Sequence, residues 1–481
     1  MSQYKMISIP EAQEAVLAVT PVLGPEEAPL GSAVGRILAQ SVSARDSLPP
    51  FPASIKDGYA VVSSDGLGDY PVASESRPGA LPDAPLQPGT VCYITTGAPV
   101  PAGADAVIQV EDTQKLPASD GRAAVRILKA AKPGQDIRPV GSDIQQGAEV
   151  LAAGERVGVA EVGILATVGA TALPVVRRPV VAVLSTGDEV VEPSTAALGP
   201  GQIRDCNRSM LLAAAAAAGA GVVDLGIAGD TEGSVEGALQ RALDAGADVL
   251  ITSAPRTLTL STPLILLQTV RPPPGGVSMG DKDLIKPLLA RQGEIHFGRV
   301  RMKPGKPLTF ATLPVAAGAG APGQPAREKV LVFGLPGNPV SSFVCFNLVV
   351  LPALRKMSGW GAPLLRRVRV WTTSALKLDP ERPEYHRATI CYGRYPETAG
   401  AAAAGAVAAA VGGADACVWY AVSTGNQISS RLLSARSANA LLEVPQASGA
   451  LAAGTEVSAL IIDDLGRMPV PGEVPVTEGF F

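Results

Sequence analysis

The sequence predicts a multidomain α/β protein, and three regions of the chain carry this prediction. Between residues 178 and 360, continuous apolar segments alternate with helical ones, which indicates a doubly wound βαβ domain whose parallel sheet is covered on both faces. Residues 46–144 form short, turn-separated segments that predict a β-rich domain. Residues 361–481 favour strands again and predict a C-terminal β-barrel-like domain. At 481 residues, the chain is long enough to build a core in each domain.

The N-terminal part is expected to be helical. A helical pattern covers residues 9–38, with Pro10 at its start, and a second one covers residues 157–168. Because the β-rich segment separates these patterns, we predict a helical or mixed domain made of residues 1–45 and 145–177, into which residues 46–144 are inserted. Four strands are expected in the insertion, at residues 58–62, 91–96, 106–110 and 124–128.

The region 178–360 is expected to place ligand-binding turns at one edge of its sheet. Strands are predicted at residues 180–185, 222–225, 248–253 and 330–333, and helices at residues 210–218, 235–245 and 343–350. Ligands of parallel sheets bind beyond the carboxyl ends of the strands. The turn 334–338 leads from a strand into a helix whose N-terminus can receive an anion, although an ordinary strand-to-helix turn would read the same way.

A short basic segment also suggests an anion site. Lys303 and Lys306 lie three residues apart, each followed by a proline that restricts the backbone. A solvated basic loop is the alternative. The net charge of −4 argues against general nucleic-acid binding, so any anion site must be local.

Composition limits the other function classes. The five cysteines are far apart and fit a reducing compartment, and only two histidines are present, which argues against a Ser–His–Asp hydrolase or a histidine-rich metal site. No apolar run approaches the ~20 residues of a membrane span, and we expect a cytoplasmic protein without membrane or nucleic-acid partners. Two Gly/Ala-rich tracts, residues 316–326 and 399–416, are predicted to be flexible loops.

Ten short motifs occur in order along the chain. They are 52–60 (PASIKDGYA), 95–98 (TTGA), 184–189 (LSTGDE), 201–205 (GQIRD), 275–283 (GGVSMGDKD), 303–307 (KPGKP), 334–341 (GLPGNPVS), 386–387 (HR), 423–425 (STG) and 429–434 (SSRLLS). With these motifs the chain resembles the molybdenum insertases of the MoeA and gephyrin E-domain family, and especially the plant E domain.

The resemblance implies an activity and a fold. It implies a molybdopterin molybdenumtransferase with a MogA-like α/β domain, which inserts molybdate into adenylated molybdopterin with Mg²⁺-dependent release of AMP. It assigns the oxyanion clamp to five residues, Lys303, Lys306, Arg387, Ser341 and Ser434. Cationic and hydroxyl donors suit a dianion, because charge-assisted hydrogen bonds are strong. For Arg387, an ion pair with Glu384 is the alternative.

The resemblance also implies further ligands. The positions implied in binding the pterin nucleotide are Asp57, Thr96, Thr186, Gly187, Asp188, Ser253, Gly275, Gly276, Ser278, Pro304, Pro307, Pro336, Gly337 and Asn338. Asp230 and Asp283 would hold Mg²⁺, with Glu189 as a third candidate, since Mg²⁺ prefers carboxylate oxygens; both aspartates could instead cap helices. Asp57 and Thr96 would reach a neighbouring subunit's site, which implies a homodimer. A G-domain-type molybdopterin adenylyltransferase is the expected partner.

Three departures from the family pattern bear on activity. Residues 254–274 form a 21-residue, largely apolar insertion between Ser253 and Gly275, and a retained intron would explain it. Gly229-Asp230-Thr231 replaces Arg-Asp-Asp, and Asn426 stands where relatives have His. A non-catalytic scaffold of the gephyrin type and an inactive paralogue are therefore the alternatives to an enzyme.

Overall fold

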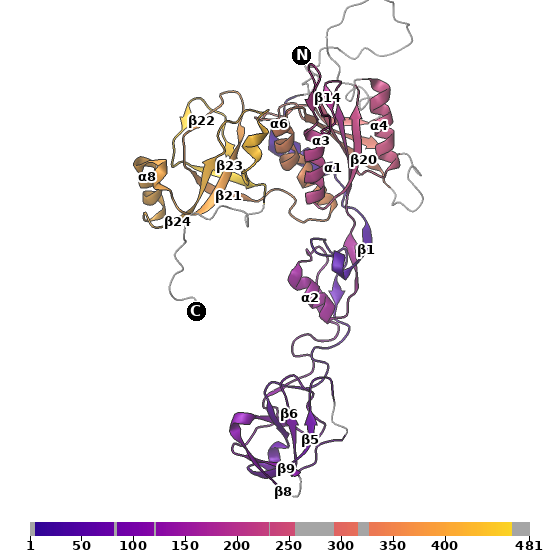
Figure 1. Ribbon diagram of the computed structural model, residues 1–481, viewed down its shortest axis with the longest axis vertical. Coiled ribbons are helices and arrows are strands. Elements are labelled where there is room, and N and C mark those ends of the chain that lie inside the picture. The colour runs from indigo at the N-terminus through magenta and orange to yellow at the C-terminus, as the bar shows by residue number, and fades with distance from the viewer. Residues whose placement is uncertain are drawn as a thin grey trace, which may run out of the picture. The chain divides into compact units, whose positions relative to one another are not determined.

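The computed structural model describes residues 5–80, 84–119, 122–229, 231–254, 293–315 and 327–463. The chain divides into two compact units, one of residues 26–175 and one that joins residues 1–25 to residues 176–481 (Figure 1). The larger unit holds an α/β sheet and a C-terminal barrel.

The α/β sheet of the larger unit has six strands. Their order is β16 (Gly221–Ala228), β13 (Val180–Thr186), β17 (Val249–Ala254), β20 (Lys329–Pro336), β19 (Thr309–Pro314) and β18 (Glu294–Phe297). The first four strands are parallel, as predicted. β19 pairs antiparallel with both β20 and β18, and neither β19 nor β18 was predicted.

Helices cover both faces of this sheet (Figure 1). The strands carry apolar side chains on both faces, and both faces must therefore be shielded from water. The core on one face includes residues of α1 (Ile9–Val19), α3 (Asn207–Ala217) and α6 (Pro339–Cys345). The core on the other face includes residues of α4 (Glu232–Asp244). The sheet with its two helical layers confirms the predicted α/β class.

The N-terminal helix differs from the prediction in length and in packing. It ends at Val19, whereas a helical pattern was predicted to continue to residue 38. Pro21 and Pro25 follow closely, and proline cannot continue a helix. Ile9, Ala12 and Val16 are buried in the core of the α/β sheet, so residues 1–25 pack with this unit and not with residues 26–45.

Helix α6 continues through a π-helical turn (Phe346–Val350) into α7 (Leu351–Met357). Within the described residues, this continuous helix is the one long and apolar enough to cross a membrane, but 78% of its most apolar window is buried inside the protein. It is a core helix of the α/β unit.

The C-terminal domain is a closed barrel, as predicted. Its strands follow one another in the order β21 (Arg367–Thr372), β24 (Cys417–Ser423), β23 (Glu384–Arg394), β25 (Ala440–Val444) and β27 (Glu456–Ile461). A short pair, β22 (Leu376–Lys377) and β26 (Ala450–Leu451), lies beside it.

One of the two predicted flexible loops is a helix. Residues 399–416 contain α8 (Ala401–Val411), which buries Ala403 and Val407. The prediction was wrong because alanine has the highest intrinsic helix propensity, and Gly412 ends the helix in the left-handed region at φ 88°. The other predicted loop, residues 316–326, lies outside the described residues.

The smaller unit contains the predicted β-rich insertion. Its six strands are ordered β7 (Ala106–Gln109), β4 (Gly58–Val61), β6 (Val91–Ile94), β5 (Gly68–Ser76), β9 (Arg122–Ile127) and β8 (Thr113–Ser119). All four predicted strands are present, and β5 and β8 are additional. This unit also contains α2 (Val159–Thr167) and three strand pairs: β1 (Pro25–Pro29) with β12 (Ala172–Val176), β2 (Val42–Ser43) with β11 (Glu149–Leu151), and β3 (Ala53–Ser54) with β10 (Ile137–Arg138).

Candidate functional site

The carboxyl ends of the parallel strands meet at one edge of the sheet, where an asparagine joins them. Asn207, the first residue of α3, donates one Nδ2 hydrogen bond to Ser253 Oγ at 2.7 Å and another to the backbone oxygen of Gly337 at 2.7 Å. The end of β17 and the turn after β20 are thereby fixed to each other. Asn207 was not predicted; it follows the 201–205 motif by two residues.

An ion network centred on the buried pair Asp205 and Arg208 holds the segment before Asn207. Asp205 accepts hydrogen bonds from Ser185 Oγ at 3.0 Å and from Nε of Arg208 at 3.0 Å. The same arginine pairs with Asp224 at 2.7 Å and with Glu192. These contacts fix the loop between β13 and α3, and therefore the predicted ligands at residues 186–189. Asp205 was recognised as part of the 201–205 motif, but its role in holding this loop could not be predicted from the sequence.

The loop after β13 carries the predicted nucleotide and metal ligands. The short pair β14 (Val190–Val191) and β15 (Ile203–Arg204) closes this loop. Gly187 has a φ of 137°, a conformation that favours glycine, and its N–H donates to the backbone oxygen of Ala228 at 3.2 Å. Asp188 lies beside Gly229, since its Oδ1 would be 3.3 Å from a Cβ at that glycine. One acidic side chain, that of Asp188, therefore lies beside Gly229, the residue before the expected metal ligand Asp230.

The other expected metal ligands, Asp230 and Asp283, lie outside the described residues, as do Gly275, Gly276 and Ser278. Within the described part of the chain, no group of three His, Cys, Asp or Glu side chains could hold a metal ion. Glu189 is half-buried in the loop after β13. The described residues alone do not complete a magnesium site.

The turn from β20 into α6 lies next to a loop of the barrel. Asn338 is the N-cap residue of α6, and its backbone oxygen accepts from the N–H of Ser342 at 3.0 Å. The N–H of Val340 donates to the backbone oxygen of Ser429, in the barrel loop, at 3.1 Å. Ser341 is buried in the first turn of this helix. The helix start and the barrel loop therefore contact each other directly.

Arg387, on β23, is the most unusual charged residue of the larger unit. Its side chain is 0% exposed, and Nε and Nη2 lie 3.3 and 3.0 Å from Ser434 Oγ. Its Nη1 is buried and has no hydrogen-bond partner in the described structure. Burial lowers the pKa of this guanidinium to about 10, although the charge of Glu384 acts in the opposite direction. A buried cation with a free donor is suited to an anionic ligand.

Glu384 does not form the ion pair with Arg387 that was the alternative interpretation. Its carboxylate lies 2.9 Å from Lys303 Nζ, and Asp379 lies 3.4 Å from the same atom. Burial opposes the charging of Lys303, but hydrogen bonds and charges of these two carboxylates outweigh it and raise its pKa. Lys306 is exposed.

The structure therefore joins most of the predicted oxyanion clamp within one unit. Arg387 contacts Ser434, the barrel loop contacts the start of α6, and Lys303 is tied to β23 through Glu384. Asp57 and Thr96 belong to the smaller unit, where the N–H of Thr96 donates to Asp57 Oδ1 at 2.7 Å. Pro304 and Pro307 flank the two lysines in the segment beside β23.

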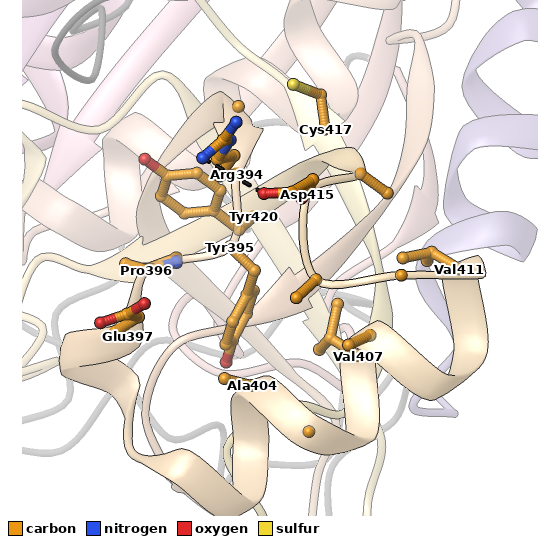
Figure 2. Close-up of a pocket in the computed structure, with 16 residues that line it drawn as sticks. Arg394, Tyr395, Pro396, Glu397, Ala404, Val407, Val411, Asp415, Cys417 and Tyr420 are labelled. Atoms are coloured by element: carbon orange, nitrogen blue, oxygen red, sulfur yellow. Dashed lines mark ion pairs between the residues drawn. The ribbon is translucent and has the colours of Figure 1, made fainter.

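A pocket of 510 Å³ lies elsewhere, between α8 and strands β23 and β24 of the barrel (Figure 2). It is lined mainly by small apolar side chains such as Ala404, Val407 and Val411, and an Arg394–Asp415 ion pair of 3.2 Å lies at one side. None of the predicted site residues lines it. Short side chains of the alanine-rich helix α8 form one wall of this pocket.

Three family models match successive stretches of the chain. The MoeA N-terminal region (domain I and II) matches residues 7–169, and the MoeA C-terminal region (domain IV) matches residues 409–462. The probable molybdopterin binding domain matches residues 182–254 and 274–356. Residues 255–273 are left unmatched, which is where the insertion was predicted.

Curated relatives cover nearly the whole chain. Molybdopterin molybdenumtransferase 2 of Mycobacterium tuberculosis is 34% identical over 94% of this chain and 98% of its own length. Gephyrin of Dictyostelium discoideum is 36% identical over 97% of this chain, and the molybdenum cofactor synthesis protein cinnamon of Drosophila melanogaster is 35% identical over 83%. The chain spans only 64% and 57% of the lengths of these last two relatives.

A solved structure agrees with the sequence relatives. The molybdopterin biosynthesis MoeA protein from Pyrococcus horikoshii superposes with a TM-score of 0.71 at 25% identity, over 95% of this chain and 99% of that one. The matches follow the order of the predicted motifs and confirm the predicted resemblance. The chain therefore belongs to the MoeA family of molybdenum cofactor biosynthesis.

Proposed function

We propose that this protein is a molybdopterin molybdenumtransferase, which inserts molybdate into adenylated molybdopterin and releases AMP. The proposal rests on the family membership and on one observation above all, the fully buried Arg387 whose Nη1 has no partner in the described structure. A buried cation without a carboxylate contact is costly for folding alone. It is explained if the site exists to bind an anion.

Molybdate is a tetrahedral dianion, and the residues around Arg387 can bind it. The guanidinium supplies a free donor at Nη1, while its Nη2 donates to Ser434 Oγ at 3.0 Å. Lys303 and Lys306 add positive charge from the neighbouring segment, and Ser341 is placed at the start of α6. Because Arg387 and Ser434 are buried, their hydrogen bonds to an anion are stronger than they would be in water.

The adenylated pterin would occupy the adjacent edge of the sheet. Thr186, Ser253 and Gly337 lie at the ends of neighbouring parallel strands, the place where nucleotides bind in such sheets. Asn207 fixes two of these ends to each other, so the edge is preorganised. In the proposed arrangement, molybdate binds on the side of the barrel and the nucleotide binds at the edge of the sheet.

Three further parts of the proposal come from the family resemblance. Mg²⁺ would be held by Asp230 and Asp283, with Glu189 as a third candidate, and would neutralise charge on the leaving phosphate. Asp57 and Thr96 would act at the site of a second subunit, so the active form would be a homodimer. A G-domain-type adenylyltransferase would supply the adenylated pterin, in the cytoplasm.

The test is a single-turnover assay with adenylated molybdopterin bound to the protein. Adding molybdate with Mg²⁺ should release AMP and yield cofactor that activates an apo-molybdoenzyme. Lys306→Ala should slow cofactor formation roughly ten- to a hundredfold, since one charge-assisted hydrogen bond is worth about 1.5–3 kcal/mol.

Lys377→Ala is the matched control, because this exposed lysine lies on β22, in the short strand pair beside the barrel, and is not a predicted site residue. It should behave like the wild type. Retention of full activity by Lys306→Ala, or AMP release unaffected by EDTA, would contradict the corresponding part of the proposal. A protein that binds the pterin nucleotide but never forms cofactor would instead favour the scaffold alternative.

A further inference from the structure

Glu384 connects the clamp lysine to a histidine. Its side chain is 5% exposed, with Oε2 at 2.9 Å from Lys303 Nζ and Oε1 at 3.0 Å from Nδ1 of His386. The other ring nitrogen, Nε2, lies 2.7 Å from Ser423 Oγ. Ser423 Oγ also accepts the N–H of Gly425 at 3.2 Å, so its own hydrogen is free to be donated to His386.

These contacts are all satisfied by a neutral imidazole. In that form Nδ1–H donates to Glu384, and Nε2 accepts from the hydroxyl of Ser423. The carboxylate of Glu384 then has Lys303 as its one cationic contact in the described structure, while Arg387 acts on it only through space. Glu384 keeps a lowered pKa despite burial because His386 and Lys303 both donate to it.

The positive charge of Lys303 is already shared by two carboxylates, so none is left over to neutralise a bound dianion. Lys303 faces two carboxylates, Glu384 and Asp379. Asp379 has other donors, the N–H groups of Glu381 and Arg382 at 2.9 and 3.1 Å, and does not depend on the lysine. The strand on the other side, β25, adds no charge here: Leu442 pairs with His386, and Glu443 is held by Arg367.

If Lys303 turns from Glu384 toward a bound oxyanion, the carboxylate of Glu384 loses the one cation that it contacts among the described residues. A buried carboxylate in that state is strongly unfavourable unless another positive charge replaces the lysine. His386 is already in contact with it, and histidine is the side chain that can gain a proton near neutral pH. Protonation at Nε2 would turn the hydroxyl of Ser423 from donor to acceptor and would break no other contact.

We propose that oxyanion binding at Lys303 is coupled to uptake of one proton by His386, whose imidazolium then replaces the lysine as the cationic partner of Glu384. The proton comes from solvent and is added to Nε2, and no covalent bond is broken. This coupling rests on the proposed function and deepens it: Glu384 and His386 are positioning residues that let the clamp lysine move its charge from the protein to the substrate.

Calorimetry of molybdate binding tests the coupling. Titrations at about pH 7.5, where molybdate is a dianion, are run in two buffers with different ionisation enthalpies, and the difference in heat gives the protons taken up. The wild type should take up a measurable fraction of one proton per molybdate. Because binding takes up a proton, lowering the pH from 7.5 should increase the affinity.

Two isosteric variants should change the affinity in opposite directions. Glu384→Gln removes the buried charge, so it should bind molybdate roughly tenfold more tightly and without proton uptake. His386→Gln cannot supply the replacement cation and should bind more weakly, also without uptake. A merely structural cluster would weaken binding in both variants. Glu443→Gln, which removes a carboxylate from the neighbouring strand, should keep the wild-type proton uptake.

The results that overturn the coupling are distinct from those that overturn the function. Molybdate binding by the wild type with equal heats in both buffers would overturn the coupling alone. Weaker binding by Glu384→Gln would do the same. Absence of any binding by the wild type would overturn both. If a variant does not fold, the comparison of buffers with the wild type still decides.

Discussion

Replacing Arg387 by methionine should make the protein more stable and remove its molybdate site. Burial lowers the pKa of this guanidinium from its ordinary value to about 10, so the folded state disfavours its charge. At about 1.36 kcal/mol for each pH unit, keeping the cation buried costs roughly 3 kcal/mol. Methionine has a long, flexible, apolar side chain that can fill much of the same space.

Part of this gain is offset by lost hydrogen bonds. The guanidinium contacts Ser434 Oγ at 3.0 and 3.3 Å, and Ser434 keeps its own bond to the backbone oxygen of Arg431 at 2.7 Å. A net hydrogen bond is worth about 1 kcal/mol. We therefore expect Arg387→Met to raise the free energy of unfolding by about 1–2 kcal/mol.

Urea unfolding and molybdate calorimetry on the same preparations measure both effects. The matched control is Arg369→Met, since Arg369 lies on the same barrel with its side chain 71% exposed. The control should keep molybdate binding and change stability by less than ~0.5 kcal/mol. The reasoning is refuted if Arg387→Met loses stability by more than the control, or if it binds molybdate with wild-type affinity.

Three further outcomes are expected. Burial lowers the pKa of His296 in the folded protein, so the unfolded chain binds a proton at a higher pH and stability falls as the pH drops below about 6.5. His296→Gln should flatten this part of the pH–stability curve, and an unchanged curve would contradict the assignment. In α8, no atom lies within 4 Å of a Cβ added at Gly405, so Gly405→Ala should stabilise the protein by about 0.5–1 kcal/mol, whereas Gly412→Ala, at φ 88°, should destabilise it by a similar amount. Thermal melts in which both variants change stability in the same direction would refute the helix. Deleting residues 255–273, which match no part of the family, should leave molybdate affinity at least as high as in the full chain, and a loss of binding by calorimetry would show that the segment belongs to the site.

The alternation of apolar strands and helices was sufficient to predict the parallel part of the sheet. β13, β17 and β20 begin and end within a few residues of the expected segments, because strands buried on both faces have to be continuously apolar. β18 and β19 were not recognised because His296, Thr309 and Thr312 interrupt the apolar pattern. Helix α8 was missed because its composition suggested low complexity, although alanine by itself favours a helix.

The motifs identified Arg387 and Ser434 as members of one site, but they could not show why Arg387 is suited to an anion. That depends on burial and on a missing partner, and both are properties of the packed structure. The roles of Asn207 and Glu384 also depend on residues far away in sequence, Ser253 and Gly337 in one case and Lys303 in the other.

The sequence by itself determined the family, the order of the motifs along the chain and the kinds of side chain in the clamp, which are cations and hydroxyl groups. These follow from local patterns of residues, which are readable without coordinates. Only the tertiary structure decided that Lys303 is held by Glu384 and Asp379 while Arg387 keeps a free donor. The pairing of charges is set by which side chains the folded strands bring within a few ångströms, and the energy of a charge is set by how much water the fold leaves around it.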